Sequence, residues 1–163
     1  MVMWHPDESV ESAALQILNI LYSVPQISVR LDQASGEHRG MIAFWMDYWM
    51  KNRAVLLDGE FFAASPAHNY PLVSARTGDK LIATVYQNIV VQPGAAAPPA
   101  IDVVNGTKSG RVVIHFDEDY GAASARALDV GGKVVSEKPL EILAGPIALD
   151  VPPSGLIEIR RNE

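Results

Sequence analysis

The chain has 163 residues, of which 48% are hydrophobic and 20% charged, and its formal net charge is −6. This length and composition fit a globular protein of one domain, or of one domain plus a fragment. The negative charge argues against a nucleic-acid partner, which needs a basic surface, and against binding to an anionic membrane. The sequence has no cysteine, which excludes disulfide frameworks and thiolate metal sites.

The sequence shows no signal for export or membrane insertion. The first eleven residues lack the basic stretch followed by an apolar core that a secretory signal has. The best candidate for a membrane span, residues 13–24, is too short and includes Gln16 and Asn19. We therefore expect a soluble protein, and the absence of cysteine favours the cytoplasm.

The first quarter of the chain predicts a short strand and a helix. Residues 1–4, MVMW, suit the end of a buried strand, and Pro6 keeps His5 out of the helical conformation. A helix capped by Asp7 or Ser9 follows, because its apolar residues recur at helical spacing: Val10, Ala13, Ala14, Ile17, Leu18 and Leu21. Pro25 stops it. Residues 26–31 alternate polar and apolar, which predicts an extended segment or a loop lying on the helices.

An aromatic helix is the strongest single pattern. One helix face would carry Met41, Phe44, Trp45, Tyr48 and Trp49, which fall at helical spacing. Such a stripe could stack on sugar rings, but its spacing is typical of a face packed on a core. We expect the helix to end near Asn52, because residues 55–57 (VLL) and the Asp58-Gly59 turn signal read as the start of a β half.

The remainder of the chain predicts an all-β domain. Short β-rich runs alternate with turn residues, as in a sandwich or barrel; they cover residues 60–63, 72–76, 80–86, 88–92, 101–104, 111–116, 122–129, 133–136, 140–143, 147–151 and 156–160. Gly131-Gly132 predicts a two-residue hairpin turn. The predicted fold class is therefore α+β, a mainly antiparallel, jelly-roll-like β-sandwich (residues 56–163) preceded by two helices (residues 1–55).

Few residues suggest chemistry. The acidic cluster at residues 117–119 could bind Ca²⁺, but it fits a solvated turn better, because no complete calcium-loop pattern follows. Residues 68–71 (HNYP) could form a polar recognition corner or a plain loop. The four histidines are far apart, and no two acids can be assigned as a glycosidase pair. We therefore assign no catalytic residue, metal ligand or cofactor.

Several segments together resemble a known family. MVMWHP at residues 1–6, VESAALQ at 10–16, VPQISV at 24–29, FWMDYW at 44–49, RAVLLDG at 53–59 and NYPLV at 69–73 are similar to the C-terminal region of melibiase-type α-galactosidases, in glycoside hydrolase clan D. The resemblance is strongest over residues 1–86. It implies the last strand and helix of a (β/α)₈ catalytic barrel, followed by an antiparallel β-sandwich.

The resemblance also implies a function. Family members cleave terminal α-linked galactose with retention, using two aspartates on earlier barrel strands that have no counterpart here. Trp4 and His5 would lie at the barrel mouth and line the sugar pocket of a complete enzyme. We therefore predict a catalytically silent portion of an α-galactosidase-like glycoside hydrolase, whose sandwich supports the barrel and could form homo-oligomer contacts. The alternatives are a carbohydrate-binding module, which needs a groove with exposed aromatics, and an assembly module.

Overall fold

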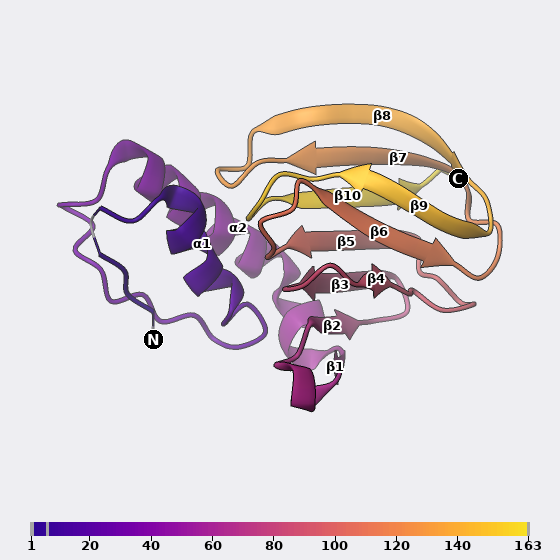
Figure 1. Cartoon of the computed structure of the whole chain (residues 1–163), viewed down its shortest axis with the longest axis horizontal. Coiled ribbons are helices and arrows are strands. Elements are labelled where there is room, and N and C mark those ends of the chain that lie inside the picture. The colour runs from indigo at the N-terminus through magenta and orange to yellow at the C-terminus, as the bar shows by residue number, and fades with distance from the viewer. Residues whose placement is uncertain (1, 6, 163) are drawn as a thin grey trace.

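The computed structural model describes residues 2–5 and 7–162, which form two helices and ten strands (Figure 1). The predicted effect of Pro6 falls outside the described residues. The helices are α1 (Val10–Leu18) and α2 (Gly36–Asp58), and a short 3₁₀ turn, η1, spans Pro66–His68. The strands are β1 (Glu60–Ala63), β2 (Leu72–Arg76), β3 (Lys80–Val85), β4 (Val90–Val91), β5 (Ala100–Asn105), β6 (Arg111–Phe116), β7 (Gly121–Leu128), β8 (Val134–Ile142), β9 (Gly145–Asp150) and β10 (Leu156–Arg161).

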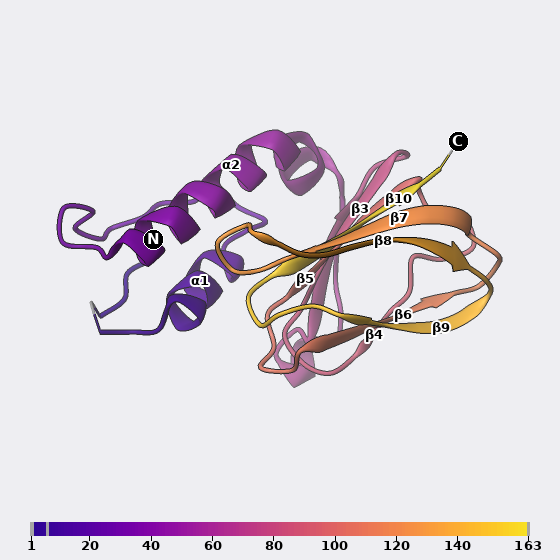
Figure 2. The same cartoon turned by 90° about the horizontal axis from the view of Figure 1, so that it is seen from above.

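The strands form two layers, and the helices lie at one end of them (Figure 2). The larger sheet has the order β1-β2-β3-β5-β10-β7-β8, and the smaller one β4-β6-β9. Most neighbours are antiparallel, but β3 with β5 and β4 with β6 are parallel. The prediction of an α+β protein dominated by a sandwich is confirmed, with two parallel pairs that the sequence did not reveal.

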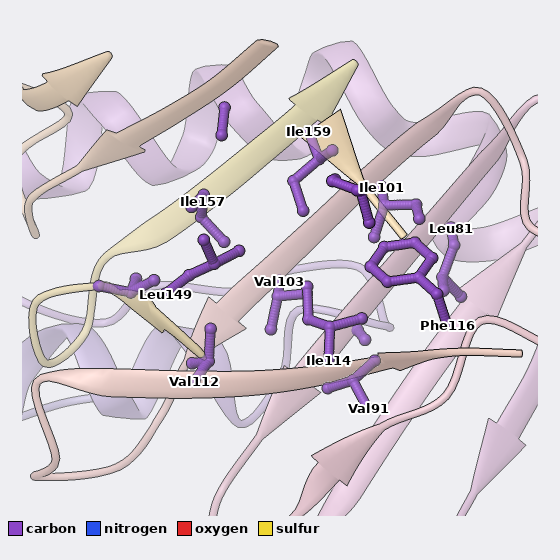
Figure 3. Packing of buried hydrophobic residues seen from close by; sticks show 14 of the residues in the cluster. Leu81, Val91, Ile101, Val103, Val112, Ile114, Phe116, Leu149, Ile157 and Ile159 are labelled. Carbon is purple, nitrogen blue, oxygen red and sulfur yellow. The ribbon is translucent and has the colours of Figure 1, made fainter. Parts of the chain in front are cut away.

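Side-chain alternation directs apolar residues of the larger sheet to both of its faces. In β5, Ile101 and Val103 point into the core between the sheets, together with Ile114 and Phe116 from β6 (Figure 3). Val104, one residue on, belongs to a second core formed with the helices. This alternation follows from the two-residue period of a strand. The larger sheet therefore packs on the smaller sheet with one face and, at one end, on the helices with the other.

Both helices begin where a serine caps them. Ser9 accepts a hydrogen bond from the amide of Ser12 at α1, and Ser35 does the same for His38 at α2, each at 3.2 Å. Ser9, rather than Asp7, is therefore the cap of α1. The helix ends at Leu18, earlier than predicted, although Leu21 still lies in the core.

The predicted end of the second helix is wrong. It continues past Asn52 through residues 55–57 to Asp58, so the helical part runs beyond the predicted boundary at residue 55. The reason is that Leu56 extends the buried face, four residues after Asn52 and eight after Tyr48, and is only 3% exposed. The run VLL is short enough to suit either a strand or a helix, and the helix forms because it packs Leu56 on the sheet.

Two predictions about the last hairpin need correction. The turn at Gly131-Gly132 joins β7 to β8 as expected, but the loop is longer than two residues, because Asp129 N donates to Lys133 O at 2.9 Å. Gly132 has φ +82°, which favours glycine. The predicted strands at 133–136 and 140–143 are one strand, β8, and Pro139 is tolerated in it because β8 lies at the edge of the sheet.

Candidate functional site

The contact between the helices and the larger sheet is the most elaborate feature of the molecule. Met41, Trp45 and Tyr48 of α2 are buried, and Phe44 and Trp49 are partly buried against the same core. The sheet contributes Ile82, Val104, Leu128 and Leu156. The aromatic stripe is therefore a packing face, as its spacing predicted, and it is not available to stack on sugars.

Polar groups reinforce this contact along the first helix. Tyr86 OH donates to Leu18 O at 2.8 Å, and Ser154 Oγ donates to Glu11 O at 2.8 Å. Tyr22 OH lies 3.0 Å from both Val73 O and Thr84 Oγ1. Burial raises the pKa of Tyr22 and of Tyr86 above the ordinary value, so both phenols stay neutral and keep their hydrogen bonds at physiological pH. These bonds fix the position of α1 on the sheet.

A buried carboxylate lies at the centre of the contact made by α2. Asp102 on β5 is fully buried, and its Oδ2 accepts a 2.8 Å hydrogen bond from Tyr48 OH of α2. Lys80 Nζ from β3 lies 2.7 Å from the same oxygen. Arg160 Nη1 from β10 lies 2.6 Å from Oδ1. Arg160 thus forms a close ion pair with Asp102. The same Nη1 also donates a hydrogen bond to Ile159 O at 2.9 Å.

The cluster extends back into the helix. Lys80 Nζ donates to Asn52 Oδ1 at 2.6 Å, and Asn52 Nδ2 donates to Tyr48 O at 2.9 Å. Burial, and then the charge of Asp102, raise the pKa of Tyr48 well above its ordinary value. Burial alone would lower the pKa of Arg160, but the negative charge of Asp102 outweighs it and leaves that pKa raised. Tyr48 is thus a neutral donor, and Arg160 a permanent cation.

This arrangement can hold elements together, but it cannot act as an acid–base pair. Asp102 has no exposure to solvent, and its two oxygens face a tyrosine, a lysine and an arginine. Glu158, which lies on β10 two residues before Arg160, is paired with Arg126 at 2.9 Å and with Arg160 at 3.5 Å. Across the described residues, no group of three His, Asp or Glu side chains could hold a metal ion.

The side chains of Trp4 and His5 lie in different surroundings. Trp4 stacks on His38 of α2, with ring centroids 6.2 Å apart, and lines a shallow hollow of about 220 Å³ beside Val29 and Gln33. The side chain of His5 is 73% exposed and lies 3.4 Å from the Asp7 carboxylate. Trp4 is therefore partly a packing residue. The predicted role of both residues in a complete enzyme stays a prediction.

The other candidates occupy loops. Asp117 and Glu118 are exposed in the turn between β6 and β7, and Asp119 accepts a hydrogen bond from Ala144 N at 2.8 Å. This fits a solvated turn. In the HNYP segment, Asn69 and Tyr70 have positive φ angles of 56° and 51° and line a cleft of about 760 Å³.

Sequence reasoning missed Asp102, Lys80 and Arg160. A signal was present, because Asp102 interrupts the apolar run of β5 at the position that alternation assigns to the sheet face opposite Ile101 and Val103. A buried acid needs a partner, and long cationic side chains on the neighbouring strands are the expected ones. The strand order that makes β3 and β10 the neighbours of β5 could not be read from the sequence.

Comparisons of the chain with protein families, with curated proteins and with solved structures found no match. The fold and the contacts above are therefore the observations on which a function can be argued. Of the helices in the described part of the chain, none combines the length and the apolarity needed to cross a membrane.

Proposed function

We propose that this chain is the supporting C-terminal portion of an α-galactosidase-like glycoside hydrolase, with helices that belong to its barrel and a sandwich that buttresses them. The finer assignment of the sandwich as jelly-roll-like is part of this proposal. The chain alone is silent toward α-galactosides, because the one buried carboxylate among the described residues is held by two cations and a phenol.

The observation that carries the proposal is a single parallel β-bridge near the N-terminus. Val2 bridges Ile27 in parallel, through Val2 N to Gln26 O at 2.8 Å and Ser28 N to Val2 O at 2.9 Å. The helix α1 connects the two positions, and α2 follows the second. Parallel strands linked by a helix form the βαβ unit of α/β barrels and open parallel sheets. The bridge and α1 thus have the connectivity of one such unit, reduced to a single bridging residue on each side.

Apolar side chains near this bridge are exposed to solvent, as they would be if neighbouring barrel strands were absent. Parallel strands are ordinarily buried on both sides by neighbouring strands and helices. Here Met3, next to the bridge, is 65% exposed, and Val24 and Leu31, on either side of Ile27, are 64% and 51% exposed. Apolar residues at the flanks of two parallel strands are what further barrel strands would cover.

The helix–sheet contact supports the buttressing role. The two helices bury their apolar faces on the larger sheet, and the Asp102 cluster ties α2 to β3, β5 and β10. A rigid sandwich attached in this way would fix the position of the last barrel helices. The alternative of an assembly module would use the same exposed apolar flank for a second copy of the chain.

Two measurements test the proposal. The purified chain is assayed with 4-nitrophenyl α-D-galactopyranoside, and no release above buffer is expected. Antiserum against the chain is then used to recover the native polypeptide. Its mass should exceed 17.7 kDa by at least the mass of most of a (β/α)₈ barrel. Saturable hydrolysis by the pure chain would refute its silence. A native species of 17.7 kDa that forms dimers would favour the assembly module.

A further inference from the structure

A cleft lies between the end of α1 and the β1–β2 edge of the larger sheet. Its volume is about 760 Å³, within the range of roughly 300–1,000 Å³ of small-molecule sites. Phe61, Tyr70 and Tyr86 line it, together with Asn19, Ser23 and Asn69. The cleft thus combines aromatic surfaces with side chains that can donate and accept hydrogen bonds.

Two of the aromatic rings are open to solvent. Phe61 is 57% exposed and Tyr70 is 47% exposed, whereas the deeper Tyr22 meets Phe61 edge-on, with centroids 5.9 Å apart. Tyr22 OH is already bonded to the sheet. The accessible surface is therefore the faces of Phe61 and Tyr70, with the amides of Asn19 and Asn69, both exposed residues, beside them.

The loop that carries Tyr70 is held in an uncommon conformation. Ser65, Asn69 and Tyr70 all have φ between 44° and 56°, around the η1 turn. Left-handed backbone is unusual for a tyrosine and costs conformational free energy, which sites that bind ligands often accept to place a side chain. The HNYP segment, which sequence reasoning could take as a plain loop, here places an amide and a ring at the cleft.

The charge of the cleft limits the ligand. Of the described residues that line it, none is an acid, a lysine, an arginine or a histidine, and burial raises the pKa of Tyr22 and Tyr86 further from neutrality. Charged ligands would find no counter-ion. A neutral ring with one apolar face and a rim of hydroxyls matches aromatic faces flanked by amides.

We propose that this cleft binds a neutral hexopyranose, stacked on Phe61 and Tyr70 and hydrogen-bonded to Asn19 and Asn69. The site is formed by residues of this chain alone, so it goes beyond the supporting role proposed above. Sugar binding here and the size of the native polypeptide are independent readouts, and one can fail without the other.

The test is a titration of the full chain followed by ¹H–¹⁵N NMR, with methyl α-D-galactopyranoside and methyl β-D-glucopyranoside as probes. We expect saturable shifts of the Asn19 and Asn69 side-chain amides. The Trp49 indole should report as well, because its Nε1–H donates to Ser23 O at 2.9 Å. Cyclohexanol and glucuronate, which lack the hydroxyl rim or carry a charge, should bind at least about tenfold more weakly.

The chain offers a matched control. Phe62 is 58% exposed, as Phe61 is, but it points to the opposite face of β1, toward Leu72 and Leu81. Phe61→Ala should weaken pyranoside binding about tenfold, the loss expected for one stacked ring, and Phe62→Ala should leave it unchanged. Tyr70→Asn, which tolerates positive φ, is the second variant should Phe61→Ala not fold.

Several results would overturn the proposal. One is the absence of saturable shifts with either pyranoside up to about 50 mM, beyond the weakest useful affinities. Equal weakening by Phe61→Ala and Phe62→Ala is another. Cyclohexanol binding as well as the sugars would show an apolar pocket only. Cleft shifts that depend on protein concentration without ligand, and vanish in Phe61→Ala, would show that a second copy of the chain occupies the cleft.

Discussion

Replacing Asp102 by asparagine tests whether the buried cluster fastens the helices to the sheet. The substitution keeps the shape of the side chain and the hydrogen bond from Tyr48, but it removes the charge that Lys80 and Arg160 face at 2.7 and 2.6 Å. Lys80 would then lose its anion, and Arg160 would keep only Glu158, at 3.5 Å. The loss should therefore be electrostatic and not a matter of packing.

The magnitude follows from burial. Removing one partner of a buried ion pair costs about 3–5 kcal/mol. The Lys80 side chain is 19% exposed and that of Arg160 37%, so both retain some hydration and the lower end, about 3 kcal/mol, is expected. For a chain of this size, 1 kcal/mol shifts Tm by about 2–4 °C, so Tm should fall by about 6–12 °C.

The assay is urea denaturation at pH 7 followed by tryptophan fluorescence, with a matched surface pair as control. Asp150 pairs with Arg111 at 3.3 Å, but the two side chains are 85% and 63% exposed. Asp150→Asn should therefore cost no more than about 1 kcal/mol. If Asp102→Asn costs no more than this control, the cluster does not fasten the helices and our account of the contact is wrong.

Three further predictions concern the same contact. Trp45→Ala empties a fully buried site and should cost about 3–5 kcal/mol in urea denaturation, whereas a loss under 1 kcal/mol would mean that α2 is loosely packed. Gly132→Ala should lower Tm by several degrees, because its φ is +82° and an added Cβ would collide with the Phe44 ring; an unchanged Tm would contradict the hairpin geometry. The raised pKa of Tyr48 means that above about pH 10 the unfolded chain loses this proton while the folded chain keeps it, so stability should fall with rising pH by up to about 1.4 kcal/mol per unit. Tyr48→Phe should reduce that slope in alkaline denaturation series, and an identical slope would show that Tyr48 does not contribute.

Much of the fold was predictable because it depends on local periodicity. The aromatic stripe of α2 and the alternation of β6 are set by which residues must be buried, and three strands, β1, β2 and β6, begin and end where the sequence placed them. The prediction was wrong where two local patterns were equally acceptable. Residues 55–57 suit a helix or a strand, and only the position of Leu56 on the buried face resolved the choice.

Features that depend on strand order were beyond sequence reasoning. The parallel pairs of β3 with β5 and β4 with β6 join segments separated by other strands or long loops. The Asp102 cluster exists because β5 lies between β3 and β10, which bring Lys80 and Arg160 to one carboxylate. The cleft likewise needs α1 to end beside β1, a tertiary relation with no local signature.

The central claim is that the helical segment belongs to a larger barrel that the sandwich supports. The most direct measurement is tryptic peptide mass spectrometry of the native polypeptide, purified from its source with antiserum against this chain. The account predicts peptides from further strand–helix units that include the two missing aspartates, in the same polypeptide or in one tightly bound to it. Recovery of the 17.7 kDa chain with no such peptides would contradict the account.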